Sequence, residues 1–156
     1  MLERPLPSNP VVALVDEVIR INGRIRSIFK GVKTATGFSS MEITVLTAVV
    51  ESRLAPTVPQ IGRSLGHSRQ VIQRAVNALT AAKLVETAPN PNHKRAPLLR
   101  ATLRGQTLKR ETDAHATKAI RTLLRGIDAV KCRRVAGELR ELRGEMETYL
   151  RSARAG

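Results

Sequence analysis

The sequence predicts a mainly α-helical fold with one small β-hairpin. Along most of the 156-residue chain, apolar residues recur at steps of three and four, which is the spacing of amphipathic helices. Two helix starts are marked by a Ser or Thr followed three residues later by Glu or Gln. Two short β-compatible runs flank a single turn-rich segment. We therefore expect helices on both sides of one central hairpin.

The first expected helix runs from residue 11 to about residue 33. Its apolar residues form one stripe: Val11, Leu14, Val15, Val18, Ile21, Ile25, Ile28 and Phe29. After a break marked by glycines, Ser39 and Glu42 form a capping-box pattern that opens a second helix. That helix should end near Arg53, before the next proline.

Two shorter helices are expected to follow. Thr57 and Gln60 form a second capping-box pattern, and Gly66 ends a helix of about two turns. Ser68 caps the next helix, which should continue to about Ala82. Two helices joined by a short bend with glycine are typical of a helix-turn-helix, although an ordinary pair of antiparallel helices has a similar pattern.

The segment after these helices favours a hairpin with a positively charged tip. Residues 84–88 and 97–103 are β-compatible, and residues 89–96 between them are rich in turn formers and include Lys94 and Arg95. A basic hairpin placed directly after a helix-turn-helix is a wing. The predicted fold class is therefore a winged helix-turn-helix, mainly α with a small β-hairpin wing.

Two long helices are expected at the C-terminal end. Thr102 caps the first, and the second follows Gly126 and Asp128. Their apolar positions are Leu108, Ile120, Leu123 and Leu124 in the first, and Val135, Leu139, Leu142, Met146 and Leu150 in the second. These helices and the N-terminal one offer more apolar stripe than a small winged domain can cover, which favours a dimerisation region. Packing of the same stripes within a monomer is the alternative.

The positive charge of the chain is concentrated in its middle. The formal net charge is +14. Residues 52–110 hold eleven basic side chains and one acidic one, Glu86, so this segment alone carries +10. An acid-poor block of this kind suits a phosphate surface, whereas a face that only confers solubility intersperses both signs. We therefore expect a nucleic acid as the partner.

Within this block, one helix face has the chemistry to read bases. Its residues can all form hydrogen bonds, and it contains no acid that would repel phosphate. We predict DNA contacts from the recognition helix by Ser68, Arg69, Gln70, Gln73, Arg74 and Asn77, and from the wing by His93, Lys94 and Arg95. The alternatives are a solvated helix face and a charged, mobile loop.

Several other classes find no support in the sequence. The chain has no run of about 18 apolar residues and no apolar signal core near its start, so we expect a soluble, cytoplasmic protein without membrane association. No catalytic motif occurs, and His67, His93 and His115 show no metal-ligand spacing. We therefore expect neither enzymatic activity, nor a cofactor, nor a metal. The single cysteine, Cys132, is expected to be a plain structural residue, with a redox switch as the alternative.

These residues resemble the MarR (multiple antibiotic resistance regulator) family of winged-helix transcriptional regulators. The resemblance is carried by the run from His67 to Leu79, by residues 84–86, and by residues 90–96 leading into residues 101–105. It implies a homodimer built from the first and the last two helices, which binds a palindromic operator as a ligand-responsive repressor. It also implies a small aromatic or phenolic anion as the effector, whose binding residues the sequence leaves unknown.

The resemblance assigns residue roles and a domain plan. Arg69, Gln70, Gln73 and Arg74 match base and phosphate contacts of the family, and Arg95 matches its wing-tip arginine. The domain plan is an N-terminal dimerisation helix at 1–36, a DNA-binding lobe at 37–103 and C-terminal dimerisation helices at 104–156, forming one integrated domain. The chain departs from the family pattern at three positions, with Asn90 for an aspartate, His93 for an acid and Lys83 for a glycine.

Two further functions compete with a sequence-specific regulator. A nonspecific architectural DNA-binding protein would have the same charge, and a winged helix can also serve as a protein-interaction module. RNA binding is disfavoured because Phe29, Phe38 and Tyr149 are the only aromatic residues and none lies in the basic block.

Overall fold

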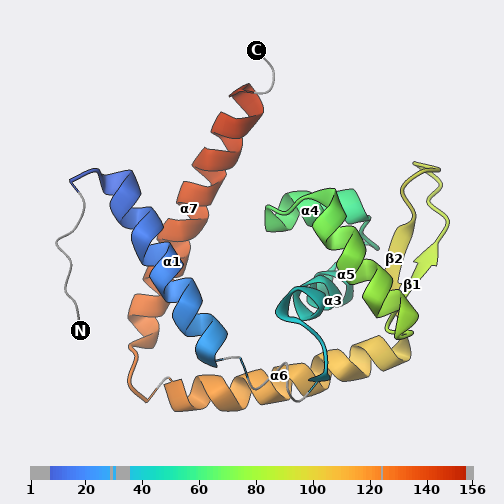
Figure 1. Ribbon diagram of the computed structural model, residues 1–156, viewed down its shortest axis with the longest axis horizontal. Helices are drawn as coiled ribbons and strands as arrows, with labels where there is room; N and C mark the ends of the chain where they lie inside the picture. Colours follow the sequence, from blue (N-terminus) through green and yellow to red (C-terminus); the bar gives the residue numbers. More distant parts are fainter. Residues whose placement is uncertain (1–7, 29, 31–35, 124, 154–156) are drawn as a thin grey trace. The chain divides into compact units, whose positions relative to one another are not determined.

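The computed structural model describes residues 8–28, 30, 36–123 and 125–153. The described elements are, in order, α1 (Pro10–Ile28), α3 (Ser40–Glu51), α4 (Val58–Leu65), α5 (Arg69–Ala81), β1 (Val85–Ala88), β2 (Leu98–Ala101), α6 (Leu103–Leu123) and α7 (Ala129–Ala153) (Figure 1). The chain divides into two compact units at Ala116 and Thr117, and each is described by itself. The predicted fold class, mainly helical with one hairpin, is confirmed.

Local hydrogen bonds fix the starts of α3 and α4 as the sequence predicts. Glu42 accepts from the backbone N–H of Ser39 at 2.7 Å, and the Ser39 hydroxyl accepts from the backbone N–H of Glu42 at 3.3 Å. Gln60 and Thr57 form the equivalent pair at the start of α4, at 2.8 and 3.4 Å. Both capping boxes satisfy N–H groups that the first turn of a helix otherwise leaves unpaired.

The bend between α4 and α5 is tight, and glycines allow it. Gly66 ends α4 with φ +68°, a left-handed conformation that glycine adopts without steric cost. One residue later, His67 donates its backbone N–H to the carbonyl of Gly62 at 2.9 Å. A side chain at position 62 would lie only 3.0 Å from the His67 carbonyl oxygen. The short helix, the bend and α5 therefore form the predicted helix-turn-helix.

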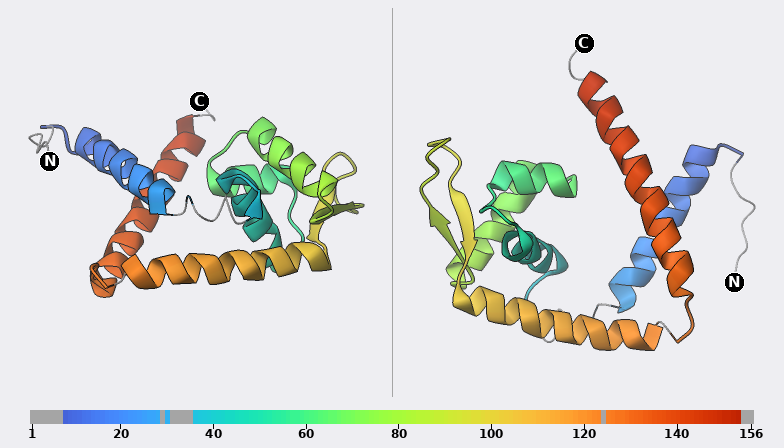
Figure 2. Two further views of the ribbon diagram at one scale, coloured as in Figure 1. Left: turned by 60° about the horizontal axis from the view of Figure 1, so that its bottom comes forward. Right: turned by 180° about the vertical axis from the view of Figure 1, so that it is seen from behind.

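The two strands pair as an antiparallel hairpin. The register pairs Val85 with Ala101 and Ala88 with Leu98. Figures 1 and 2 show that the loop of the hairpin lies at its end farthest from the start of α6. The backbone N–H of Leu99 also donates to the carbonyl of Pro56 at 2.8 Å, so the segment before α4 is attached to β2.

The lobe has one apolar core, to which α3, α4, α5 and both strands contribute. Its fully buried large side chains include Leu46, Ile72, Leu79, Leu84 and Leu99, from four different segments. The apolar face of α5, made of Ile72, Ala75, Val76 and Leu79, points into this core. The opposite face of the helix is thereby held outward.

The link between the lobe and α6 depends on a glycine that sequence reasoning did not single out. Thr102 caps α6, because its hydroxyl accepts from the backbone N–H of Gly105 at 3.1 Å. The same hydroxyl donates to the carbonyl of Lys83 at 2.8 Å. A methyl group at Gly105 would overlap with the carbonyl oxygen of Leu84, so only glycine fits there. The first turn of α6 therefore packs directly against the backbone at the end of α5.

The helices α1 and α7 contain no buried residue. Their stripes, predicted from spacing, are present as exposed apolar side chains such as Val15, Ile25, Met146 and Leu150. Part of the predicted first helix, Phe29 and residues 31–33, lies outside the described residues. The same is true of Leu124 in the predicted next-to-last helix. Among the described helices, none is long and apolar enough to cross a membrane.

Candidate nucleic-acid interface

The outward face of α5 carries the residues predicted to contact DNA. Arg69, Gln70, Arg74 and Asn77 are exposed, and Gln73 is half-buried. No acidic residue occurs in α5. The structure therefore brings these five side chains together on one hydrogen-bonding face.

A hydrogen bond joins two of these side chains. The side-chain amide of Gln73 donates to the Asn77 carbonyl oxygen at 2.9 Å, one helical turn further on. Gln73 retains one N–H and its carbonyl oxygen, and this donor and acceptor pair is complementary to the major-groove edge of adenine. Asn77 keeps its amide as a donor. The pair can therefore read a base while one side chain holds the other in place.

Ser68 has the capping role that the sequence predicts. Its hydroxyl oxygen accepts from the backbone N–H of Val71 at 3.4 Å, and its carbonyl accepts from Ile72 at 3.3 Å. The hydroxyl hydrogen is not needed for this cap. Ser68 can therefore cap α5 and still donate to a phosphate at the positive end of the helix.

The three predicted wing residues lie together in the loop between β1 and β2. His93, Lys94 and Arg95 are all exposed. The loop is closed by Asn90, whose side-chain amide donates to the carbonyl of Ala96 at 2.7 Å and whose side-chain oxygen accepts from the backbone N–H of Asn92 at 3.0 Å. The position that departs from the family pattern thus has a defined structural role.

The concentrated positive charge is available to a ligand, with one exception. Within the described residues, Lys109 alone among the eleven basic residues of 52–110 forms an ion pair, and the other ten are exposed. Charges that are exposed and unpaired attract phosphate without first breaking an internal contact. Residues 52–110 therefore present ten cations without an ion pair to solvent, one fewer than the sequence count suggested. One of the ten, Arg110, donates to the Thr107 hydroxyl at 3.0 Å.

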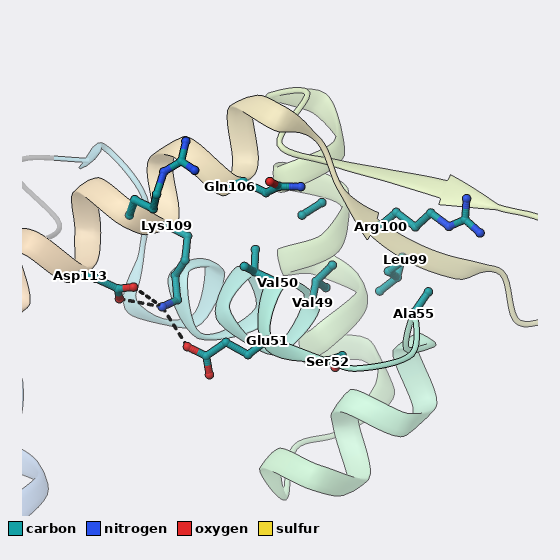
Figure 3. Close-up of a pocket in the computed structure, with 12 residues that line it drawn as sticks. Val49, Val50, Glu51, Ser52, Ala55, Leu99, Arg100, Gln106, Lys109 and Asp113 are labelled. Carbon is teal, nitrogen blue, oxygen red and sulfur yellow. Dashed lines mark hydrogen bonds and ion pairs between the residues drawn. The ribbon is translucent and has the colours of Figure 1, made fainter.

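Lys109 joins α3 to α6 at a cleft of about 560 Å³ (Figure 3). Its ammonium lies 3.0 Å from Glu51 and 2.6 Å from Asp113, and its side chain is only 8% exposed. Burial lowers the pKa of Lys109, but hydrogen bonds and attraction from Asp113 and Glu51 outweigh burial and raise it overall. The i,i+4 spacing of Lys109 and Asp113 could have indicated this local pair, whereas Glu51 comes from a distant segment.

The other two reactive side chains considered in the sequence, His115 and Cys132, lie on α6 and α7. Cys132 is exposed and free, and His115 is exposed on α6. Across the part of the chain that the structure describes, no three His, Cys, Asp or Glu side chains are grouped so that they could hold a metal ion.

Comparisons with known proteins agree with this geometry. The curated protein Rv2011c of Mycobacterium tuberculosis is 29% identical over 135 residues, covering 86% of this chain and 93% of that protein. A MarR mutant from E. coli, solved in complex with operator DNA, matches with a TM-score of 0.74 at 17% identity, covering 86% of this chain and 96% of that one. CouR from Rhodococcus jostii, solved with bound p-coumaroyl-CoA, matches with a TM-score of 0.72 at 20% identity. The match covers 86% of this chain and 92% of CouR. At these identities the structural matches establish a shared fold.

A hydrogen-bonding helix face without acids and a cationic hairpin, carried by one core, define a winged-helix DNA-binding protein. Residues 36–96 match the family model described as MarR family. This segment, which holds α3, α4, α5 and β1, is therefore similar to the MarR family.

Proposed function

We propose that this chain is a ligand-responsive repressor that binds a palindromic operator as a homodimer. The observation that carries the proposal is the pairing of two surfaces on one lobe, the acid-free outer face of α5 and the unpaired cations of the wing. One can supply base recognition and the other attraction to phosphate.

Each candidate residue has a role in this proposal. In the major groove, base edges and flanking phosphates are contacted by the outward face of α5: Arg69, Gln70, Gln73, Arg74 and Asn77. Ser68, at the start of this helix, contacts a phosphate. The wing contacts the phosphate backbone of the DNA and the adjacent minor groove through His93, Lys94 and Arg95. In a minor groove, arginine responds to the width of the groove.

The homodimer is proposed from the terminal helices. The stripes of α1 and α7 are exposed in the single chain, with Val11 65% and Leu150 52% exposed. A second copy would cover them, with residues 1–36 and 104–156 as the dimerisation region around the lobe at 37–103. The operator complex of the structurally similar MarR mutant supports operator DNA as the partner, and the symmetry of a two-fold dimer predicts a palindromic site. A two-fold dimer places its recognition helices about 34 to 36 Å apart, one turn of DNA.

The effector is proposed to be a small aromatic or phenolic anion. The structure of CouR with p-coumaroyl-CoA supports the phenolic and anionic character of the effector, because that ligand combines a phenol with the negative charge of its coenzyme A part, and not its small size. Binding of the effector would favour a spacing of the two lobes that no longer fits successive major grooves. Repression would then be relieved because the operator is released.

The direct test is a comparison of two duplexes. The wild-type protein is used to select fragments from a random library, and its affinity for the selected duplex and for a scrambled duplex is measured at physiological salt. A specific regulator should prefer the selected duplex by about 10³-fold or more, and the selected site should be palindromic. Equal affinities would instead show an architectural protein. Sedimentation at micromolar concentration should give a dimer, and a monomer would contradict the two-fold arrangement.

A further inference from the structure

The wing loop is closed by one neutral side chain. Asn90 is half-buried, and its amide donates to Ala96 while its side-chain oxygen accepts from the backbone N–H of Asn92, at 2.7 and 3.0 Å. Its backbone carbonyl accepts from the N–H of His93 at 3.3 Å. We call the two side-chain hydrogen bonds the Asn90 bridge. The bridge joins the start of the loop to its end, six residues later.

An amide is required for this bridge. An aspartate would still accept from Asn92, but an ionised carboxylate has no hydrogen to donate to the Ala96 carbonyl. Two acceptors would then face each other across the loop, at a cost comparable to a lost hydrogen bond. An aspartate would also add a negative charge to the loop that holds Lys94 and Arg95.

We propose that Asn90 is a positioning residue for DNA binding, whose neutral bridge fixes the wing loop and leaves Lys94 and Arg95 free to contact phosphate. The proposal rests on the proposed wing contact with DNA. Neither cation forms an ion pair within the described residues. A cation that is already paired with an acid of the protein releases fewer counterions when it contacts DNA. A wing loop held by an ion pair to Lys94 or Arg95 would therefore have a lower affinity for DNA.

Neutral substitutions separate the bridge from the charge. We would measure the affinity of Asn90→Ala for the selected duplex over a range of salt concentrations. Asn92→Ala is the matched control, because Asn92 lies in the same loop and contributes only its backbone N–H to the bridge. Asn90→Ala should bind about 5- to 20-fold more weakly, and its slope of log affinity against log salt concentration should be smaller by about 1 to 2. The affinity of Asn92→Ala should stay within about twofold of wild type.

Charged substitutions provide a second comparison. Asn90→Asp and Asn92→Asp add the same charge to the same loop, but only the first removes a donor from the bridge. We expect Asn90→Asp to bind at least about fivefold more weakly than Asn92→Asp. Equal losses would show that charge alone matters and would overturn the proposal.

A double-substitution background tests whether Asn90 acts through the tip. In a Lys94→Ala and Arg95→Ala background, Asn90→Ala should change affinity by less than about twofold. If it kept its full effect there, Asn90 would act on folding rather than on the tip, and the proposal would fail. Thermal unfolding of every variant accompanies these measurements.

Failure of the proposed operator function and failure of the proposed role of Asn90 give different results. If the wild type bound all duplexes equally, the operator function would fail. The same Asn90 and Asn92 variants would then be compared on a random duplex, because phosphate contacts do not depend on sequence. A larger loss for Asn90→Ala than for Asn92→Ala would still support the positioning role, and equal losses would overturn it.

Discussion

The lobe and the terminal helices use similar apolar residues in opposite ways. Among the described residues, the twelve buried apolar side chains of the core all lie between Val45 and Leu99. The helices α1 and α7 are longer than any helix of the lobe, yet neither buries a residue. The lobe therefore gains its stability from its own core, whereas the apolar stripes of the terminal helices stay exposed in the single chain.

The two regions also differ in how they use arginine. In the terminal helices, Arg20, Arg134 and Arg143 each pair with an acid four residues away. In the lobe, Arg69, Arg74 and Arg95 are exposed and have no such partner within the described residues. Paired charges on a helix surface add little stability, while unpaired ones remain available to phosphate.

The largest expected effect concerns the core. Leu79→Ala should lower the free energy of unfolding by about 2 to 5 kcal/mol, because Leu79 is fully buried, and the loss should not depend on protein concentration. The matched substitution Leu142→Ala, at a side chain 38% exposed, should cost less than about 1 kcal/mol when the chains are dilute. Urea unfolding at two protein concentrations measures both. Equal losses in dilute solution would show that the terminal helices have a core of their own.

The next effect separates base contacts from overall charge. Gln73→Ala and Arg74→Ala should each weaken binding to the selected duplex by about 1 to 3 kcal/mol per lost base contact. Binding to a scrambled duplex should change much less. Arg143→Ala, which removes the same charge from α7, is the control and should leave the affinity within about twofold. If Arg74→Ala and Arg143→Ala had the same effect, only net charge would attract DNA.

A smaller effect concerns the ion cluster between α3 and α6. Lys109→Met should lower the free energy of unfolding by about 1 kcal/mol at neutral pH, whereas the exposed Lys118→Met should have no measurable effect. Because the fold raises the pKa of Lys109, its contribution is complete below the ordinary value of 10.5. The contribution is lost as the pH rises through the higher pKa of the folded state. The difference between wild type and Lys109→Met should therefore shrink above pH 10.5, and a constant difference would contradict this role.

The smallest effect concerns the end of α5. Lys83 has φ +58°, in the left-handed region that disfavours residues with a side chain. The adjoining hydrogen bonds, from Leu84 to Leu79 and from Lys83 to Thr80, are both 2.9 Å and form the ending that usually contains glycine. Lys83→Gly should therefore raise the free energy of unfolding by about 0.5 to 1 kcal/mol. Lys83→Ala removes the same charge but keeps the strain, so a similar gain in that variant would refute the explanation.

Much of the fold follows from the sequence because its signals are local. The capping boxes at Ser39 and Thr57, the cap at Ser68 and the glycine at position 66 each involve partners within a few residues. The polar face of α5 could also be predicted, because the helical repeat separates it from the apolar face. The sequence predicts both strands to within a few residues. It assigns Leu103 to the second strand, whereas in the structure Leu103 begins α6.

Other features depend on residues that are distant in the sequence. The sequence by itself determined the helices, the hairpin, the acid-free face of α5 and the stripes of α1 and α7, because spacing and capping act over one or two turns. The tertiary structure decided that Lys109 pairs with Glu51 instead of facing phosphate, and that Gly105 packs against the backbone of Leu84. These contacts form only when separate segments meet around the core, so no local pattern could reveal them.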